Sequence, residues 1–437
     1  MPNNKSLALY NDIKDYVPGG VHSNSRFRDP HPIYFKSADG AYMTDVDDNK
    51  YLDIIMGNGA AILGHNNTEF NELMSSYLQT GIITGVETEL SVKTAKKFLE
   101  LVTPAEQVKF ANTGTEAIMH AMMIARTYTG KSDIAVIEGA YNGWHDAVNV
   151  STWPSLDLAG EAHEPKSLPG SLGLKQVTVN STLVLPFNNI EATEKLLAEN
   201  HERIAALIIE PTMIDIGYVR ADIAYLKSLR ELCTKYNIIL VFDELLTGFR
   251  ESKGGAQLRY GVTPDLSTFG KAISNGYPLS AVAGRAEVMR KAAPGPGSCS
   301  FVGTYNGHQV SLAASLAFME IYESQNVLQT LDTRTEILIQ KFNESAKSKN
   351  ISAIMEGKGG HFHWYFSESA PRNYREAAVT NKEAYQKFTA ALSEKNVFCS
   401  GNFLLHHAIS LAHGEKELND LVKLMDESLD VLTLVKK

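Results

Sequence analysis

Two residues near the middle of the chain have the side chains and the surroundings of a catalytic pair. Asp243 directly follows the apolar run Ile238 to Phe242, and Lys271 follows the shorter run Leu266 to Phe269. Such runs are typical of buried strands, and ligands of open α/β sheets bind where the strands end. A lysine amine at that edge is a nucleophile toward an aldehyde, and the carboxylate could pair with a cation. Taken singly, Asp243 also fits a structural ion pair and Lys271 an exposed surface charge.

Two further segments could bind an anion and a flat ring. Gly114 and Thr115 lie in a turn that enters a predicted helix ending near Tyr128. The free backbone amides and the dipole at a helix start favour a phosphate group, although Gly and Thr also form ordinary helix caps. Tyr141 comes shortly after the apolar run Ile134 to Ile137. An aromatic side chain there could stack on a heterocycle or could simply fill the core.

The elements that must position these residues predict an α/β fold. From about Thr88 onward, purely apolar runs alternate with helical stretches, as in a parallel sheet that is covered on both faces. A stripe of leucine and isoleucine with helical spacing over 223–232 connects two of the runs. The four runs are 134–137, 183–185, 207–209 and 238–242.

The two ends of the chain predict a second, smaller domain that mixes helices and strands. The N-terminal elements expected are a helix at 6–16 and strands at 34–36, 41–43 and 51–53. After about Val310 the sequence predicts long helices and a few strands, ending in a helix from Glu415. We therefore expect a large domain over 61–310, and a smaller α+β domain built from 1–60 and 311–437.

The stretch 151–173 predicts a long loop. It is rich in proline, glycine and serine and has no clear periodicity. Loops of this length often cover a functional site, but the stretch could also be a tolerated surface insertion.

Several longer motifs occur together, in an order and spacing that resemble one enzyme family. They are Pro18-Gly19-Gly20-Val21, Leu63-Gly64-His65, Asn112-Thr113-Gly114-Thr115-Glu116-Ala117, Ile209-Glu210-Pro211, Phe242-Asp243-Glu244-Leu245-Leu246-Thr247-Gly248-Phe249-Arg250, Pro264-Asp265-Leu266, Gly270-Lys271 and Gly303-Thr304-Tyr305-Asn306-Gly307. With them the chain resembles the class III aminotransferases of pyridoxal-phosphate fold type I, and among these it is most similar to glutamate-1-semialdehyde 2,1-aminomutase. The resemblance runs nearly end to end and implies a mostly parallel, seven-stranded sheet in the large domain.

This resemblance implies that the cofactor is pyridoxal 5′-phosphate. Lys271 would bind it covalently as a Schiff base and Asp243 would bond its pyridine nitrogen, so these two are the implied catalytic residues. Gly114 and Thr115 would hold the phosphate. The remaining residues implied to contact the cofactor are Glu210, Asp215, Thr304 and, on the two faces of the ring, Tyr141 and Leu245. Thr304 comes from the neighbouring subunit in this family, which implies a homodimer with shared active sites.

The N-terminal loop implies where a substrate carboxylate would bind. By resemblance, Arg26 is the carboxylate-binding arginine, Ser23 lies close by, and Asn58 takes the place of a family tryptophan. A bidentate pair between a guanidinium and a carboxylate would be a firm anchor. Arg26 could instead be a solvated loop charge.

Two other departures from the aminomutase pattern change the expected reaction. The usual Tyr-His-Gly reads Tyr141-Asn142-Gly143, and the late acidic position that handles a second amine falls near Leu405. An aminomutase must hold a doubly aminated intermediate, and Leu405 offers no counter-charge for its ammonium. We therefore predict an aminotransferase that moves an amino group between a carboxylate-bearing amino compound and a keto acid or aldehyde, by a ping-pong mechanism through pyridoxamine phosphate.

Three alternatives stay open at this point. One is the aminomutase, whose intramolecular transfer gives 5-aminolevulinate. Another is a pyridoxal-phosphate racemase or isomerase on the same scaffold. The third is a cofactor-binding protein without catalysis, used as a regulator, against which the retained Lys271 and Asp243 argue.

Composition narrows the partners to small molecules. The chain of 437 residues has 41 basic and 50 acidic side chains, a formal charge of -9, so neither nucleic acid nor an anionic membrane is an expected partner. The three cysteines are far apart, and no apolar run reaches about 18 residues, so we expect a cytoplasmic protein without disulfides. His361, His363 and the pair His406-His407 fit a strand face, and no metal site is expected there.

Overall fold

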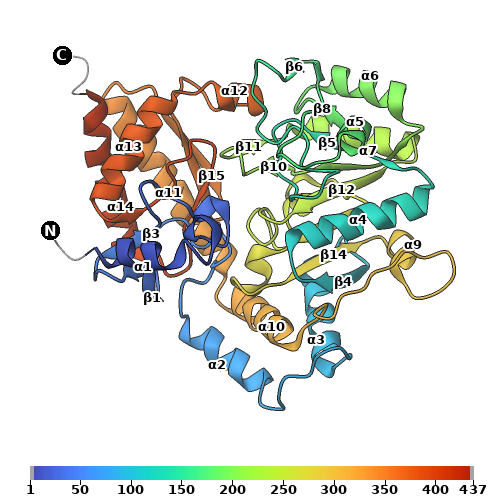
Figure 1. The fold of residues 1–437 in the computed structure, drawn as a ribbon, viewed down its shortest axis with the longest axis horizontal. Coiled ribbons are helices and arrows are strands. Elements are labelled where there is room, and N and C mark those ends of the chain that lie inside the picture. The colour runs from blue at the N-terminus through green and yellow to red at the C-terminus, as the bar shows by residue number, and fades with distance from the viewer. Residues whose placement is uncertain (1–3, 434–437) are drawn as a thin grey trace.

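A seven-stranded sheet forms the centre of one region of the molecule in the computed structural model, which describes residues 4–433 (Figure 1). Its strands are β4 (Gln107–Ala111), β5 (Asp133–Ile137), β8 (Leu183–Leu185), β9 (Ile204–Ile209), β12 (Ile239–Glu244), β13 (Leu266–Phe269) and β14 (Ser280–Gly284). The strand order is β4-β14-β13-β12-β9-β5-β8, and only β14 runs antiparallel to its neighbours. The mostly parallel α/β sheet expected from the sequence is therefore confirmed, and the four predicted apolar runs lie in β5, β8, β9 and β12.

Helices cover both faces of this sheet. The helices are α4 (Gly114–Thr129) on one face, and α6 (Ile190–Asn200) and α7 (Ile223–Lys235) on the other. Alternate residues of β9 face opposite ways, so Ile208 packs in the cluster with α4, whereas Leu207 and Ile209 pack in the cluster with α6 and α7. Burial on both faces explains why the central strands are apolar at consecutive positions.

The two ends of the chain meet in a second region (Figure 1). Its strands are β1 (Phe35–Asp39), β2 (Tyr42–Asp45), β3 (Lys50–Asp53), β15 (Ile354–Lys358), β16 (His361–Tyr365), β17 (Val397–Phe398) and β18 (His407–Ala408). Its long helices are α11 (Val327–Ser348), α13 (Lys382–Glu394) and α14 (Glu415–Thr433). The late strand β17 pairs in parallel with the early strand β3, so the N-terminal sheet is completed from the C-terminal part of the chain. The domain boundaries near residues 60 and 310 stay a prediction.

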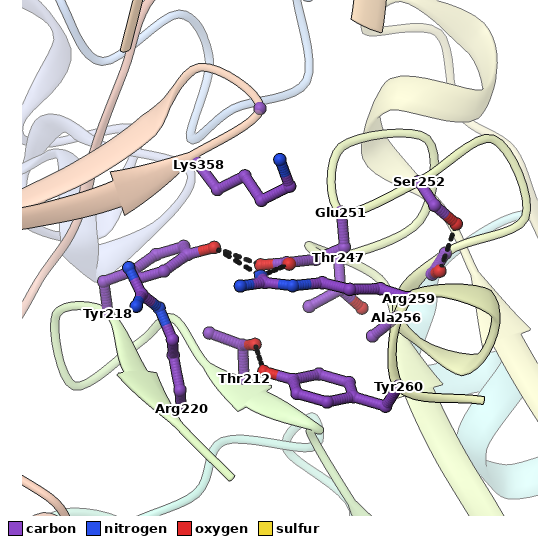
Figure 2. Close-up of polar contacts among 12 residues, drawn as sticks. Thr212, Tyr218, Arg220, Thr247, Glu251, Ser252, Ala256, Arg259, Tyr260 and Lys358 are labelled. Atoms are coloured by element: carbon purple, nitrogen blue, oxygen red, sulfur yellow. Dashed lines mark hydrogen bonds and ion pairs between the residues drawn. The ribbon is translucent and has the colours of Figure 1, made fainter. Parts of the chain in front are cut away.

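A hairpin joins the two regions, and Figure 2 shows the polar contacts around it. It consists of β10 (Thr212–Met213) and β11 (Val219–Arg220), and its β10 end is held where Thr212 contacts the Tyr260 hydroxyl at 3.1 Å. Tyr218 donates a hydrogen bond to Glu251, which also pairs with Arg259. On the other side, the backbone N–H of Tyr218 donates to the hydroxyl of Tyr365 in β16. The hairpin is therefore fixed to both regions.

The remaining elements connect these parts. The helices are α1 (Lys5–Ile13), α2 (Thr68–Tyr77), α3 (Glu89–Leu101), α5 (Gln176–Ser181), α8 (Ala256–Tyr260), α9 (Ala286–Met289), α10 (Gln309–Ser324) and α12 (Tyr374–Ala378). The predicted loop 151–173 contains only the short strands β6 (Gly160–Glu161) and β7 (Glu164–Pro165). Over residues 4–433 no helix has the length and apolar character needed to cross a membrane.

Candidate active site

Lys271 and Asp243 lie at the ends of adjacent parallel strands. Asp243, near the end of β12, is in register with Thr268 of β13, and Lys271 follows β13 after one glycine. Lys271 is half-buried and has a φ of 49°, a left-handed conformation that costs a non-glycine residue about 1–3 kcal/mol and is common at functional sites. Its charge interacts with those of Asp243, Glu210 and Asp215. The fold therefore brings the predicted pair together.

Asp243 is a buried acid whose hydrogen bonds come from uncharged groups. Its side chain accepts from Asn142 Nδ2 at 2.8 Å and from the backbone N–H of Leu245 at 3.1 Å. Burial raises the pKa of Asp243, and these two hydrogen bonds oppose the rise. Among the residues that the structure describes, no arginine or lysine forms an ion pair with it, so a structural ion pair does not explain the burial. A pyridinium nitrogen would supply the missing cation, and the site fits the expected cofactor in this respect.

Leu245 packs closely between Gly114 and Gly270, near Asp243 and Lys271. A Cβ atom at Gly114 would lie 2.7 Å from Leu245 Cδ1, and one at Gly270 would lie 2.6 Å from Cδ2. Gly114 is the first residue of α4, and the Thr113 side chain caps this helix. The open N-terminus of α4 therefore lies next to the glycine that precedes Lys271. Free amides at such a helix start suit a phosphate group.

Tyr141 flanks the same edge of the sheet and contacts the predicted loop. Its ring stacks on Trp153 with centroids 6.0 Å apart, and burial, followed by the charges of Asp215 and Asp243, raises its pKa. Trp153 belongs to the loop 151–173, and its indole N–H donates to the backbone oxygen of Asp215 at 3.1 Å. The loop thus contacts residues of the candidate site, while its role as a cover stays a prediction.

Two further carboxyl groups near Lys271 differ in their tendency to ionise. Glu210 lies between β9 and β10, and Asp215 lies in the β10–β11 hairpin. Burial and the two neighbouring aspartates raise the pKa of Glu210 well above its ordinary value, and its Oε1 has no hydrogen-bond partner. Burial alone would raise the pKa of Asp215 too, but His406 and Lys271 together bring it below the ordinary value. The His406 Nδ1 atom lies 3.4 Å from Asp215 Oδ1. The surroundings therefore favour the protonated form of Glu210 and the ionised form of Asp215.

The structure does not bring every predicted residue into this group. Arg26 is exposed at the end of a short turn and forms no ion pair within residues 4–433, and Ser23 contacts Ser25. Thr304 is exposed, as is Asn58, which has a φ of 55°. The roles of these residues toward substrate, cofactor and a neighbouring subunit stay predictions.

Three contributors were not assigned a role from the sequence. Asn142 was noticed only as a departure from a family pattern, yet it donates to Asp243. His406 precedes His407 in the sequence, and this pair predicts a strand face but not a carboxylate partner. Trp153 carried no signal beyond its place in a long loop. A buried amide or imidazole is hard to assign from sequence because its partner is distant along the chain.

Comparison with known proteins shows which family the chain belongs to. The sequence profile of the family described as Aminotransferase class-III matches residues 24–423. The chain is 35% identical over 429 residues to a protein of Archaeoglobus fulgidus named glutamate-1-semialdehyde 2,1-aminomutase, covering 98% of this chain and 100% of the relative. An omega-transaminase from Sphaerobacter thermophilus superimposes with a TM-score of 0.94 at 31% identity, over 98% of both chains. A transaminase with bound PLP has a TM-score of 0.89 at 28% identity, over 100% of this chain and 99% of the other.

Proposed function

Because the chain belongs to the class-III aminotransferases and its cofactor is pyridoxal phosphate, we propose that it transfers an amino group from a carboxylate-bearing amino compound to a keto acid or aldehyde. When bound, pyridoxal phosphate supplies an electron sink for the carbon that loses a proton. The observation that carries the proposal is the environment of the buried Asp243, which lies at the same sheet edge as Lys271. Within residues 4–433 it accepts hydrogen bonds but forms no ion pair. That arrangement suits a cationic ring nitrogen held at the strand ends.

Each residue has a separate task in this proposal. Lys271 holds the cofactor through its amine and, once released by the incoming substrate, moves a proton between the reacting carbons as base and then acid. Asp243 keeps the ring nitrogen protonated through charge pairing in a site of low dielectric. The first turn of α4 binds the phosphate, and Leu245 packs against one face of the ring. Arg26 is the proposed anchor for the substrate carboxylate.

A second candidate function is the intramolecular aminomutase reaction. The curated relative from Archaeoglobus fulgidus carries that name, and the names of such relatives favour this candidate over intermolecular transfer. The surroundings of residue 405 favour intermolecular transfer, because a half-buried leucine there offers no charge to a second ammonium group. Both candidates use Lys271 and Asp243 in the same way, so they differ in whether the amino group passes to a second substrate or returns to another carbon of the same compound.

One experiment tests the proposal and separates the two candidates. The holoenzyme is mixed with single amines and amino acids, and separately with glutamate 1-semialdehyde without any acceptor. We expect at least one donor alone to convert the cofactor to pyridoxamine phosphate, with the visible absorbance lost until a keto acid is added. Rapid formation of 5-aminolevulinate from the semialdehyde alone would support the second candidate instead. Turnover of a chiral amino acid without any pyridoxamine phosphate would indicate a racemase and overturn both.

A variant of Lys271 tests the attachment itself. We expect borohydride to fix the cofactor on the wild-type protein and not on Lys271→Ala, because only the lysine amine can form that bond. Lys253→Ala is the matched control, since Lys253 is exposed and pairs with Glu323. Equal labelling of Lys271→Ala and the wild type, read by mass spectrometry, would contradict the proposed role of Lys271.

The proposed assembly is a homodimer with sites at the subunit interface. Exposed apolar side chains gather in two segments, with Ile82, Ile83 and Val86 in one and Val302 and Tyr305 in the other. The two segments are adjacent, because the backbone N–H of Ile83 donates to Gln309 at 2.7 Å. Exposed apolar side chains on two neighbouring segments support a partner subunit there. The proposed interface includes Thr304, which lies between Val302 and Tyr305 in the sequence.

A further inference from the structure

A carboxyl group and an imidazole meet where the two regions of the molecule join. Asp215 lies in the β10–β11 hairpin and His406 directly precedes β18, and His406 Nδ1 is 3.4 Å from Asp215 Oδ1. The side chain of His406 is 4% exposed and that of Asp215 is 14% exposed. Among the described residues neither ring nitrogen of His406 has an aligned hydrogen bond, to Asp215 or to any other group. Asp215 is the carboxyl group that lies within ion-pairing distance of this buried ring.

The charged groups near Asp215 have opposite effects on its ionisation. Glu210 and Asp243 are carboxyl groups within electrostatic range of it, and Tyr141 is an acidic hydroxyl that responds to its charge. Lys271 is the cation that acts on it. Crowded carboxyl groups favour protonation of at least one of them, so Asp215 needs a donor to remain charged.

Burial is the main reason why the neutral form of the His406 ring is favoured. Burial lowers the pKa of His406, the contact with Asp215 and its charge raise it, and the cations of Lys271 and Arg250 lower it again. His361 packs edge-on against the ring with centroids 4.7 Å apart, and the pKa of His361 is itself well below the ordinary value because of burial. The buried rings of His363 and His407 also lie within its electrostatic range. A neutral imidazole can donate one N–H to a carboxylate without cancelling its charge.

We propose that His406 is a positioning residue for Asp215, and that the two side chains together hold one negative charge beside the amine of Lys271. The carboxylate favours a protonated nitrogen on Lys271 by charge attraction. His406 acts only through Asp215, by donating a hydrogen bond that keeps the carboxylate ionised and aimed. Because the donor comes from the C-terminal region, the charge depends on the contact between the two regions. This inference rests on the proposed attachment of the cofactor to Lys271.

The test is a pH titration of the visible absorbance of the holoenzyme. That absorbance changes when the nitrogen joining Lys271 to the cofactor loses its proton. We expect His406→Leu to lower the midpoint by about one pH unit, a tenfold change in proton affinity, because the favourable charge is lost or displaced. Asp215→Asn should lower it at least as far. In Asp215→Asn the further change His406→Leu should have no effect, since the residue through which it acts is already uncharged.

Two further variants guard against a purely structural effect. His406→Asn keeps an N–H donor attached to Cγ, as Nδ1 is, and should retain a midpoint within a few tenths of a unit of the wild type. His406→Met has no N–H donor, and should behave like His406→Leu if the leucine variant does not fold. His363→Gln is the matched control, because it changes an equally buried ring that bonds to the backbone oxygen of Phe403 instead.

Two results would overturn the inference. One is an unchanged midpoint in folded His406→Leu and His406→Met, and the other is an equal shift from His406→Leu with and without Asp215→Asn. These results are distinct from a failure of the proposed function. If no amine donor converts the cofactor but the midpoints shift as expected, the inference stands without the aminotransferase. If Lys271→Ala still holds the cofactor covalently, the proposed attachment fails before any titration.

Discussion

Glu210, Asp215 and Asp243 lie within electrostatic range of the amine of Lys271. The three carboxyl groups have different environments, and therefore different proton affinities. Burial raises the pKa of Asp243 and, more strongly, that of Glu210, whereas His406 and Lys271 lower that of Asp215. Groups separated in this way can take different roles in one site. Protonation is favoured at Glu210, which could then donate a hydrogen bond, and ionisation is favoured at Asp215. A cation against Asp243 would oppose the effect of burial on its pKa.

A change at Asp243 tests its charge at nearly constant shape. Asp243→Asn keeps the size of the side chain but cannot pair with a protonated ring nitrogen. We expect the variant to bind the cofactor and to lose at least about 100-fold in kcat, because a neutral ring is a poorer electron sink. Asp133→Asn is the control, since Asp133 lies at the start of β5 and pairs with Arg203. Steady-state rates within threefold of the wild type would contradict the role given to Asp243.

The sequence predicted some of these residues because their signals are local. Asp243 and Lys271 each follow an apolar run, and in a parallel sheet such runs end at the same edge. The contact between Asp215 and His406 has no local signal, because it joins residues that are far apart along the chain. Arg26 depended on the family resemblance alone, and nothing in its exposed loop fixes where the guanidinium lies.

At the scale of elements, the start of α4 requires a glycine, which has no side chain, at position 114. Gly114 and Gly270 leave room for the two methyl groups of Leu245, so this residue cannot move away from one glycine without meeting the other. The turn at Gly114 and the apolar residues after it predicted the helix, whose Thr113 cap and Glu116 form a capping box. The local sequence could not predict that Leu245 requires a glycine at the first position, because that contact is tertiary.

Gly114→Ala tests this packing. The added methyl group must displace Leu245, so we expect cofactor binding to weaken by about 1–3 kcal/mol, the usual cost of overpacking. Leu245→Val removes the crowded carbons, so the double variant should bind better than the sum of the two single effects predicts. Gly401→Ala is the control, since nothing lies within 4 Å of an added Cβ there. Strictly additive losses, measured as dissociation constants by fluorescence titration, would exclude a clash with Leu245.

At the scale of the whole molecule, two regions meet at the β10–β11 hairpin. The hairpin is held by Glu251 and Arg259 on one side (Figure 2). On the other side it is held by Tyr365. The α/β region was predictable from its alternating apolar runs and helices. The joining of the two chain ends into one sheet was not predictable from pattern, because pairing between distant strands leaves no periodic signal.

The proposed dimer gives a prediction at this scale. We expect light scattering to give a mass near twice 48.0 kDa for the wild type. Val302→Asp should weaken the dimer, because it places a charge on an exposed apolar surface that the partner would cover. Leu172→Asp, at a fully exposed leucine elsewhere, should leave the mass unchanged. A wild type that is monomeric at micromolar concentration would exclude the shared sites.

The parallel pairing of Leu52 with Val397 also constrains how the chain folds during synthesis. The edge of β3 stays unpaired until almost the whole chain has left the ribosome, whereas the central sheet is complete once residue 284 has emerged. Long-range pairing of this kind slows folding and exposes a strand edge to other chains. Nascent chains of this protein therefore carry an aggregation-prone edge at their oldest end, and chaperone demand should fall only when the last elements are released.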